Sequence, residues 1–315
     1  MKLNKSKIVA LSLAAILAVG GASGTVAAAG ESDGTSSSHA LDYQSYGLAP
    51  HSYSRILSLK GIPSRYLSAY SRQTVTVGGA SLSVKGVQIN GIAYIPFRTA
   101  AEALGASYSY SSSTGVGTMK TAGLVFTAGN GCYVSYANDR ALFSISPNVL
   151  MNDGRLYIPA STFAKAVGMS VYEGATETRI SGSFKPILHA SKFYREDEVF
   201  WLARIIHAES QGEPLLGQIA VGNVVMNRAR SAYYPNTIYG VIFDRKYGVQ
   251  FSPILNGTIY NNPSYNARLA AMICLEGYDI SEGAFFFLEP TLSSSSWIPN
   301  SRKYLYTIGH HDFYA

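Results

Sequence analysis

The sequence predicts an α+β protein, with a small mixed α/β domain over residues 73–182 and a mainly helical domain over residues 194–315. At 315 residues, the chain has room for two folded domains of about 100–200 residues each. Two patterns support this division. A strand-and-helix unit is repeated in the first region, and apolar residues at helical spacing dominate the second from about Tyr194 onward.

Residues 1–29 have the pattern of a secretory signal peptide. Three lysines precede an apolar run over residues 8–19, and small residues suited to cleavage follow at positions 27–29. The alternative is a membrane anchor, but a transmembrane helix usually needs about 20 apolar residues. No later segment is long and apolar enough to span a bilayer, so we expect an exported protein with no stable membrane insertion.

The formal net charge of +6 overstates the basicity of the mature chain, because the leader contributes three lysines and no acids. The remainder has no stripe of clustered Lys and Arg, so we expect no nucleic-acid partner. Cys132 and Cys274 fall in different predicted domains. Exported disulfide scaffolds are much richer in cysteine, so we expect both residues to be small buried hydrophobic side chains.

Residues 30–72 are rich in Ser, Gly and Tyr, which predicts a flexible linker after the leader. Beyond it, the alternating segments 74–77 and 82–84 predict strands. Residues 183–193 predict a second linker, since Pro186 interrupts any regular element.

The internal repeat aligns residues 91–107 with residues 154–170, at an offset of 63. Each copy contains Tyr-Ile-Pro, then a stretch rich in Ala, then Gly. This pattern predicts a short strand that ends at Pro, a helix of about two turns and a Gly C-cap. Two related strand–helix units should share one sheet and one core.

This region resembles the copper amine oxidase N-terminal-like domain, a stalk module of secreted bacterial proteins. The resemblance covers residues 73–182 and rests on the Tyr-Ile-Pro and Ala-x-Ala-x-Gly pattern of both copies. It implies a role in spacing or wall attachment. The segment has no His and one Cys, so we expect no copper site in it.

Residues 195–210 predict a helix that carries Glu209 in its last turn. Acids in the first turn suit the positive end of the helix dipole, and an apolar stripe that includes Leu202 and Ile206 continues to Glu209. Burial without a cationic partner would raise the pKa of this carboxyl. A Glu that is protonated near neutral pH can donate a proton to a glycosidic oxygen. The alternative is a structural Glu that bonds a neighbouring loop.

The second region resembles the SleB/CwlJ-type cell wall hydrolases, which include spore-cortex-lytic enzymes. The similarity covers about residues 194–315. The matching motifs are Leu202-Ala203-Arg204, Ala208-Glu209, Gly212-Glu213-Pro214, Gly217-Gln218, Asn227-Arg228, Tyr234-Pro235-Asn236-Thr237-Ile238, Gln250-Phe251-Ser252, Ala284-Phe285-Phe286-Phe287, Ser296-Trp297-Ile298 and Ile308-Gly309-His310.

This resemblance implies a mainly helical fold similar to goose-type lysozyme and lytic transglycosylases, with a small β element. It also implies that Glu209 is the catalytic residue and that the bond cleaved joins N-acetylmuramic acid to N-acetylglucosamine in peptidoglycan. The expected partner is the glycan strand, and the expected location is the cell wall or spore cortex of a Gram-positive bacterium. We expect a monomer that uses no cofactor.

Several further residues are candidates for substrate binding. Residues 216–230 predict a second helix, on which Gln218 and Asn223 could contact substrate, whereas Asn227 is better suited to bonding backbone. Core packing is the default interpretation of Phe286, although its ring could stack on sugar. The candidate substrate-binding residues are Gln218, Asn223, Phe286, Trp297 and His310.

A second catalytic carboxylate would be needed for a two-acid mechanism, about 5–9.5 Å from the first. The candidates are Glu213, Asp244, Glu276, Glu289 and Asp312. Glu213 could line the cleft or merely solvate a loop. Relatives often carry Asn at the position of Glu289, so any role of a neutral amide there is in doubt.

Three rival hypotheses remain. His207, Glu209, His310 and His311 suggest a zinc amidase, but His207 and Glu209 point about 200° apart on a helix and do not easily share one ion. A Ser or Cys nucleophile lacks the Gly-x-Ser-x-Gly elbow, and Cys274 lies in an apolar run. A wall-binding protein with an inactive hydrolase domain is the non-enzymatic alternative.

Overall fold

The computed structural model describes residues 71–89, 91–150, 154–246, 248–293 and 297–315. The predicted signal peptide and nearly all of the linker that follows it lie outside these residues. The described chain forms two compact units. The first comprises residues 71–195 with 275–278, and the second comprises residues 196–274 with 279–315. Among the described residues, no helix has the length and apolar character that crossing a membrane requires.

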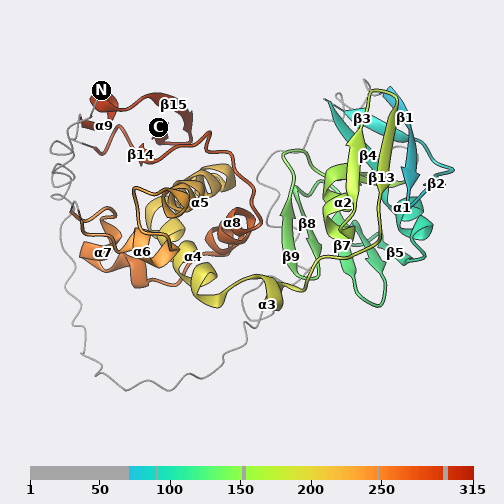
Figure 1. Ribbon diagram of the computed structural model, residues 1–315, viewed down its shortest axis with the longest axis horizontal. Helices are drawn as coiled ribbons and strands as arrows, with labels where there is room; N and C mark the ends of the chain where they lie inside the picture. Colours follow the sequence, from blue (N-terminus) through green and yellow to red (C-terminus); the bar gives the residue numbers. More distant parts are fainter. Residues whose placement is uncertain (1–70, 90, 151–153, 247, 294–296) are drawn as a thin grey trace, which may run out of the picture. The chain divides into compact units, whose positions relative to one another are not determined.

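The main sheet of the first unit is largely antiparallel, with one parallel pair, and its strands follow the order β10-β11-β4-β3-β1-β13-β12. The parallel pair joins β1 to β13, so the beginning and the end of this unit lie side by side (Figure 1). The strands are β1 (Ser71–Val77), β3 (Gly86–Ile89), β4 (Ile92–Pro96), β10 (Val149–Leu150), β11 (Leu156–Pro159), β12 (Ser170–Glu173) and β13 (Glu177–Ser181), and β2 (Ala80–Ser81) pairs with β1.

The two copies of the repeat lie side by side in this sheet, next to its β10 edge. Strands β4 and β11 pair antiparallel, with Ile95 opposite Ile158. Each strand ends at a Pro that serves as N-cap of the following helix, α1 (Phe97–Ala103) or α2 (Ala160–Val167). Both copies contribute to one core, which confirms the predicted shared sheet and core.

Gly168 provides the predicted left-handed C-cap of α2, at a φ of 64°. A Cβ atom there would lie 1.8 Å from the carbonyl oxygen of Lys185, so the chain passes too close for any side chain. Lys185 belongs to the predicted second linker. In the structure this segment bonds back to α2 and then forms α3 (Ala190–Phe193).

The strand predicted over residues 82–84 is wrong. Strand β2 ends at Ser81, and the chain turns before β3 begins at Gly86. Leu82 packs on the core from the segment between these strands. Its burial explains why residues 82–84 alternate between apolar and polar side chains as a strand does. The sequence also did not predict the five-stranded meander of β5 (Ser107–Ser111), β6 (Val116–Lys120), β7 (Val125–Gly129), β8 (Val134–Ala137) and β9 (Arg140–Phe143).

The second unit is built around the long helix α5, which packs on α4 and α6 (Figure 1). Gly222 lies where three helices meet, because a Cβ atom there would be 2.8 Å from Ile206 of α4 and 2.7 Å from Cys274 of α8. The helices are α4 (Glu196–Ser210), α5 (Leu215–Arg230), α6 (Ile238–Ile242), α7 (Pro253–Asn256), η3 (Thr258–Tyr260), α8 (Tyr265–Leu275) and α9 (Trp297–Ser301).

A small antiparallel sheet covers another side of α5. Its strand order is β14-β16-β15, with bounds Phe286–Leu288, His311–Tyr314 and Tyr304–Ile308 respectively. Phe313 of β16 is fully buried against Ala220, Val221 and Val224 of α5. The predicted fold class, a small α/β domain followed by a mainly helical domain with a β element, is therefore confirmed.

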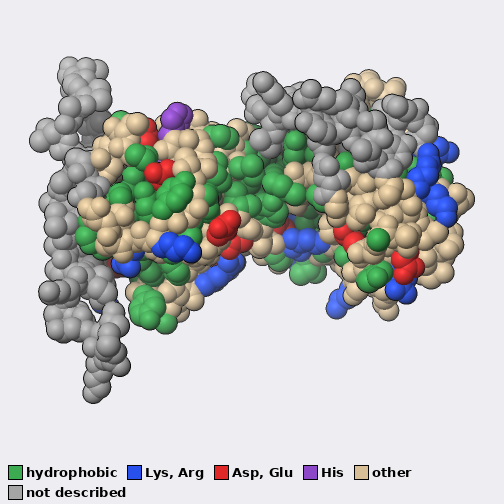
Figure 2. Space-filling view, turned by 90° about the horizontal axis from the view of Figure 1, so that it is seen from above, with side chains coloured by type: hydrophobic (Ala, Val, Ile, Leu, Met, Phe, Trp, Pro, Cys, Tyr) green, Lys and Arg blue, Asp and Glu red, His purple; other side chains and the backbone are tan. Residues whose placement is uncertain are grey.

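Both predicted buried cysteines are confirmed as free and buried. Burial raises the pKa of the Cys132 thiol to about 11 and moves that of Cys274 higher still, so both remain protonated. Figure 2 shows Lys and Arg side chains in small separate groups on the face in view, with acidic and hydrophobic side chains between them.

Candidate active site around Glu209

Glu209 is the penultimate residue of α4. The predicted acids in the first turn of this helix are present, and Leu202 and Ile206 of its apolar stripe are fully buried. The side chain of Glu209 is partly buried at the other end of the helix. Within the part of the chain that the structure describes, no hydrogen bond reaches its carboxyl group. The site therefore holds a partly buried acid whose carboxyl group receives no hydrogen bond from the described residues.

Two opposed effects set the proton affinity of this acid. Desolvation by burial raises the pKa of Glu209, and the positive charge of Arg228 lowers it. Burial is the larger effect, and it raises the pKa to about 7. Near neutral pH the carboxyl is therefore divided between its protonated and ionised forms. This is the range in which one group can first donate a proton and then accept one.

Arg228 is the site residue that the sequence analysis missed. It lies on α5, is 5% exposed, and its Nε donates a hydrogen bond of 2.8 Å to the carbonyl oxygen of Phe285. Its guanidinium carbon lies over three aromatic rings, at 5.3 Å from Tyr234, 5.2 Å from Phe251 and 5.4 Å from Phe286. An Arg on the inner face of an apolar helix was the available signal, since buried charges are rare without a partner.

Two predicted substrate contacts lie inside the fold. Gln218 is 1% exposed, and its amide donates to the backbone oxygen of Glu213. Asn223 is 2% exposed and accepts a hydrogen bond from the backbone nitrogen of Ile280. Asn227 donates to the backbone oxygen of Ala284, as predicted. Asn223 and Asn227 therefore bond the chain that follows α8 to helix α5, whereas Gln218 bonds the turn that precedes α5.

The predicted aromatic contacts, by contrast, lie together near the surface. Phe286 of β14 and Trp297 of α9 meet edge to face, with ring centroids 5.9 Å apart. The guanidinium of Arg302 lies over both rings, and Trp297 is 39% exposed. The ring of Phe286 also lies under the guanidinium of Arg228.

Glu213 and His310 hold a hairpin turn. One carboxylate oxygen of Glu213 lies 2.9 Å from Nδ1 of His310, and the other accepts a hydrogen bond of 3.0 Å from the backbone nitrogen of His310. Gly309 precedes it at a φ of 62°, and a Cβ atom there would collide with the Glu213 carboxylate. Burial pushes the pKa of Glu213 upward, but the bonds from His310 outweigh it and lower the pKa. Glu213 is thus bound to the hairpin.

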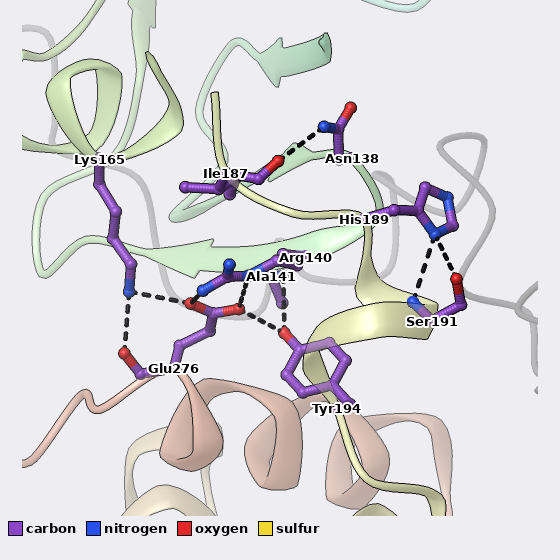
Figure 3. Close-up of polar contacts among 9 residues, drawn as sticks. All are labelled: Asn138, Arg140, Ala141, Lys165, Ile187, His189, Ser191, Tyr194 and Glu276. Carbon is purple, nitrogen blue, oxygen red and sulfur yellow. Dashed lines mark hydrogen bonds and ion pairs between the residues drawn. The ribbon is translucent and has the colours of Figure 1, made fainter. Parts of the chain in front are cut away.

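The other candidate carboxylates also have partners. Glu276 receives two hydrogen bonds from Arg140 and one from Tyr194, and Lys165 lies 2.9 Å away (Figure 3). These residues all belong to the first unit, which includes the segment 275–278. The remaining three carboxylates accept local hydrogen bonds. Asp244 accepts one from the backbone nitrogen of Lys246, Glu289 from the hydroxyl of Thr291 and Asp312 from the hydroxyl of Thr307.

The histidines are held separately. Nδ1 of His207 accepts a hydrogen bond from the backbone of Ser264, and Nδ1 of His310 is taken by Glu213. His311 is buried against the rings of Phe287 and Phe313. Within the described ranges, no three His, Cys, Asp or Glu side chains are grouped so that they could hold a metal ion.

Family models match both parts of the chain. Residues 212–314 match the model described as cell wall hydrolase, and residues 75–181 match the copper amine oxidase N-terminal domain.

Curated relatives match over the second part. The chain is 36% identical over 120 residues to a spore cortex-lytic enzyme of Bacillus cereus, covering 38% of this chain and 45% of the relative. It is 34% identical over 120 residues to that of Bacillus subtilis, covering 38% of each. The chain thus spans less than half the length of these relatives.

Solved structures match the same part. The catalytic domain of the germination-specific lytic transglycosylase SleB from Bacillus anthracis is 35% identical, with 39% of this chain and 97% of that chain covered and a TM-score of 0.36. The catalytic domain of Bacillus cereus SleB is also 35% identical, with 39% and 92% covered and a TM-score of 0.35.

Proposed function

We propose that this chain, whose residues 212–314 match the cell wall hydrolase family, cleaves the glycan strands of peptidoglycan with Glu209 as the general acid. The bond cleaved joins N-acetylmuramic acid to N-acetylglucosamine. The observation that carries the proposal is the state of Glu209, a carboxyl that burial keeps partly protonated at neutral pH and to which no described residue donates a hydrogen bond.

The proton of Glu209 goes to the glycosidic oxygen, which leaves on the N-acetylglucosamine as a hydroxyl when the bond to C1 of the muramic acid breaks. The C6 hydroxyl of the same muramic acid then bonds to C1 and gives its proton back to the Glu209 carboxylate. The product is a 1,6-anhydro sugar, and the acid is restored. This route requires one carboxyl that serves in turn as acid and base, which a pKa of about 7 permits.

The single-acid route is favoured over a two-carboxylate mechanism by the bonding of the other acids. Glu213 is engaged by His310 and Glu276 by Arg140, while Asp244, Glu289 and Asp312 accept local hydrogen bonds. We therefore expect anhydro-muramic ends, with hydrolysis to reducing ends as the alternative outcome.

The remaining parts of the chain fit export to the cell wall or spore cortex. The pattern of residues 1–29 supports secretion. The copper amine oxidase N-terminal domain contributes spacing or wall attachment, and no His lies within residues 73–182 to support a copper site.

The test is digestion of purified peptidoglycan by the mature protein and by Glu209→Gln, with the muropeptides analysed by mass spectrometry. The Gln variant should lose about 10²–10⁴-fold in rate, the usual contribution of general acid–base catalysis. The matched control is Glu196→Gln, an exposed acid at the other end of the same helix, which should retain activity. Freed stem peptides would instead identify an amidase, and no product at all would identify a binding protein. Full activity of Glu209→Gln would refute the role of Glu209.

A further inference from the structure

An aromatic surface lies on the first half of α4 and on the two elements beside it. The ring of Trp201 is at its centre and meets four other rings edge to face. The centroid distances are 5.0 Å to Phe200, 5.3 Å to Tyr239, 5.1 Å to Phe243 and 6.4 Å to Tyr260. Phe200 belongs to α4, Tyr239 to α6 and Tyr260 to η3, and both α6 and η3 pack on α4. We call these five residues the Trp201 surface.

Three members of the Trp201 surface are open to solvent. Phe200 is 45% exposed, Tyr239 52% and Tyr260 63%, whereas Trp201 and Phe243 are partly buried. Grouped apolar side chains that remain exposed on a protein mark a binding site, because each costs free energy in contact with water. The ring contacts around Trp201 hold these side chains in place, so they lose little conformational freedom when a ligand covers them.

Polar groups border these rings. The guanidinium carbon of Arg204 lies 4.3 Å from the ring centroid of Phe200, and its Nη1 donates a hydrogen bond of 2.7 Å to the backbone oxygen of Asn261. Asn261 is itself exposed and directly follows Tyr260. A pyranose ring has the complementary make-up, since it presents C–H groups on its faces and hydroxyl or acetamido groups at its edges. Flat rings bordered by hydrogen-bonding groups therefore fit a sugar.

The exposed area of the Trp201 surface is too small for a stable protein partner. An aromatic side chain offers about 150–250 Å², so three rings that are about half exposed offer roughly 300 Å². A stable protein–protein interface buries about 800 Å² on each partner. A sugar that stacks on one exposed ring needs no more than the area that is available.

The charges beside the rings are of both signs. Arg204 is a cation, and the acid Asp197 lies one helical turn before Trp201. An anionic lipid surface would instead require a cluster of Lys and Arg side chains. N-acetylated sugar rings are uncharged and need no such cluster, so the charges favour a glycan over a membrane.

We propose that the Trp201 surface is a second glycan-binding site, which stacks on sugar rings of the peptidoglycan strand away from the bond that is cleaved. The inference rests on the proposed function, because that function supplies a polymer of N-acetylated amino sugars as the ligand. It extends the function by giving the C-terminal domain a contact that holds the strand apart from the catalytic residue.

The position of the surface on α4 suits this role. Trp201 precedes Glu209 by eight residues, so the surface lies about 12 Å back along the helix and about a quarter turn around it. The two sites are therefore separate, yet they are close enough for one polymer strand to reach both.

The experiment measures the affinity of the mature protein for purified peptidoglycan by co-sedimentation. All samples carry Glu209→Gln, so that cleavage does not alter the polymer. The test variant is Tyr239→Ala with Tyr260→Ala, which removes two exposed rings, and Tyr239→Leu with Tyr260→Leu is the second variant in case the first does not fold. Tyr239→Phe with Tyr260→Phe keeps both rings. The control is Tyr233→Ala, which removes an 87% exposed tyrosine outside the Trp201 surface.

We expect the Ala pair and the Leu pair to weaken binding about tenfold, because neither side chain offers a flat face to a sugar and exposed aromatic anchors carry much of the affinity of a binding site. The Phe pair should retain most of the affinity, and Tyr233→Ala should match the parent. A soluble β-1,4-linked hexamer of N-acetylglucosamine should compete with peptidoglycan for the parent protein.

Unchanged affinity of a folded Ala or Leu pair overturns the inference, and so does an equal loss in Tyr233→Ala. A loss without competition by the hexamer assigns the surface to the stem peptide. Self-association that the Ala pair abolishes at unchanged glycan affinity assigns it to a second copy of the chain. Both results also overturn the inference. Full activity of Glu209→Gln in the digestion refutes the proposed function instead, and the affinity ratios still decide the inference because every sample carries the same residue at position 209.

Discussion

Each unit contains a glutamate that is poorly solvated, but the two side chains differ in their hydrogen bonding. In the first unit, the side chain of Glu276 is 2% exposed and meets Arg140, Lys165 and Tyr194 (Figure 3). In the second, Glu209 receives no hydrogen bond from the described residues, and the charge of Arg228 lowers its pKa by less than burial raises it. Burial pushes the pKa of both groups upward. The bonds from Arg140, Lys165 and Tyr194 reverse this at Glu276 and lower its pKa, whereas Glu209 is left at about 7.

The comparison shows that burial does not by itself identify a functional acid. A buried carboxylate with a complete set of donors is locked in its charged form and stabilises the fold. A carboxyl with burial but few donors keeps its proton available for chemistry. The bonding partners, rather than the exposed fraction, separate the two roles.

The largest effect should come from Glu276→Gln. It leaves Arg140, whose side chain is 8% exposed, as a buried charge without its bidentate partner. Breaking a buried pair in this way costs about 3–5 kcal/mol in the free energy of unfolding. Denaturant or calorimetric unfolding of the mature protein measures this, following the transition of the first unit.

Two controls sharpen that result. Glu102→Gln removes an exposed pair with Arg98, whose side chains are 64% and 56% exposed, and should cost less than about 1 kcal/mol. Glu209→Gln should leave stability nearly unchanged while it lowers the rate about 10²–10⁴-fold. Equal losses of stability at Glu276 and Glu102 would mean that the Arg140 contacts contribute no more than a surface pair.

The pH dependence should separate the two acids. Glu209 must be protonated to donate, so kcat should fall about tenfold for each pH unit above its pKa of about 7. Glu276 has a lowered pKa, so its contribution to stability is present above the unfolded value of about 4.3 and is lost as pH falls through the folded value. Rate and unfolding profiles measured on the same samples test both. An alkaline limb that is absent through pH 9 would contradict the assignment of Glu209.

The smallest effect should come from Glu213→Gln. The neutral amide keeps one acceptor for the hairpin turn but loses the charge that bonds His310. We expect about five- to tenfold faster hydrogen exchange in β15 and β16, which corresponds to one net hydrogen bond. The turn between these strands should be affected and the strands of the first unit should not. Unchanged exchange in the hairpin would show that Glu213 does not hold it.

The sequence alone determined the features that depend on local pattern. The repeated Tyr-Ile-Pro units, their helices and the C-cap at Gly168 follow from Pro and Gly backbone preferences, which act over a few residues. The bounds of α4 and α5 follow from apolar spacing and fall within one residue of the predicted ranges. Local pattern also gave one wrong prediction. Residues 82–84 show the apolar–polar alternation of a strand, but Leu82 packs on the core from outside any strand.

Only the tertiary structure decided which polar groups meet. Asn223 and Gln218 look alike as candidate substrate contacts in the sequence, and both bond backbone inside the fold. Glu209 and Arg228 come from different helices, and Glu276 and Arg140 are separated by 136 residues. Desolvation and Coulomb energy depend on distances through space, so the proton affinity of each acid is fixed by neighbours that spacing along the chain does not reveal.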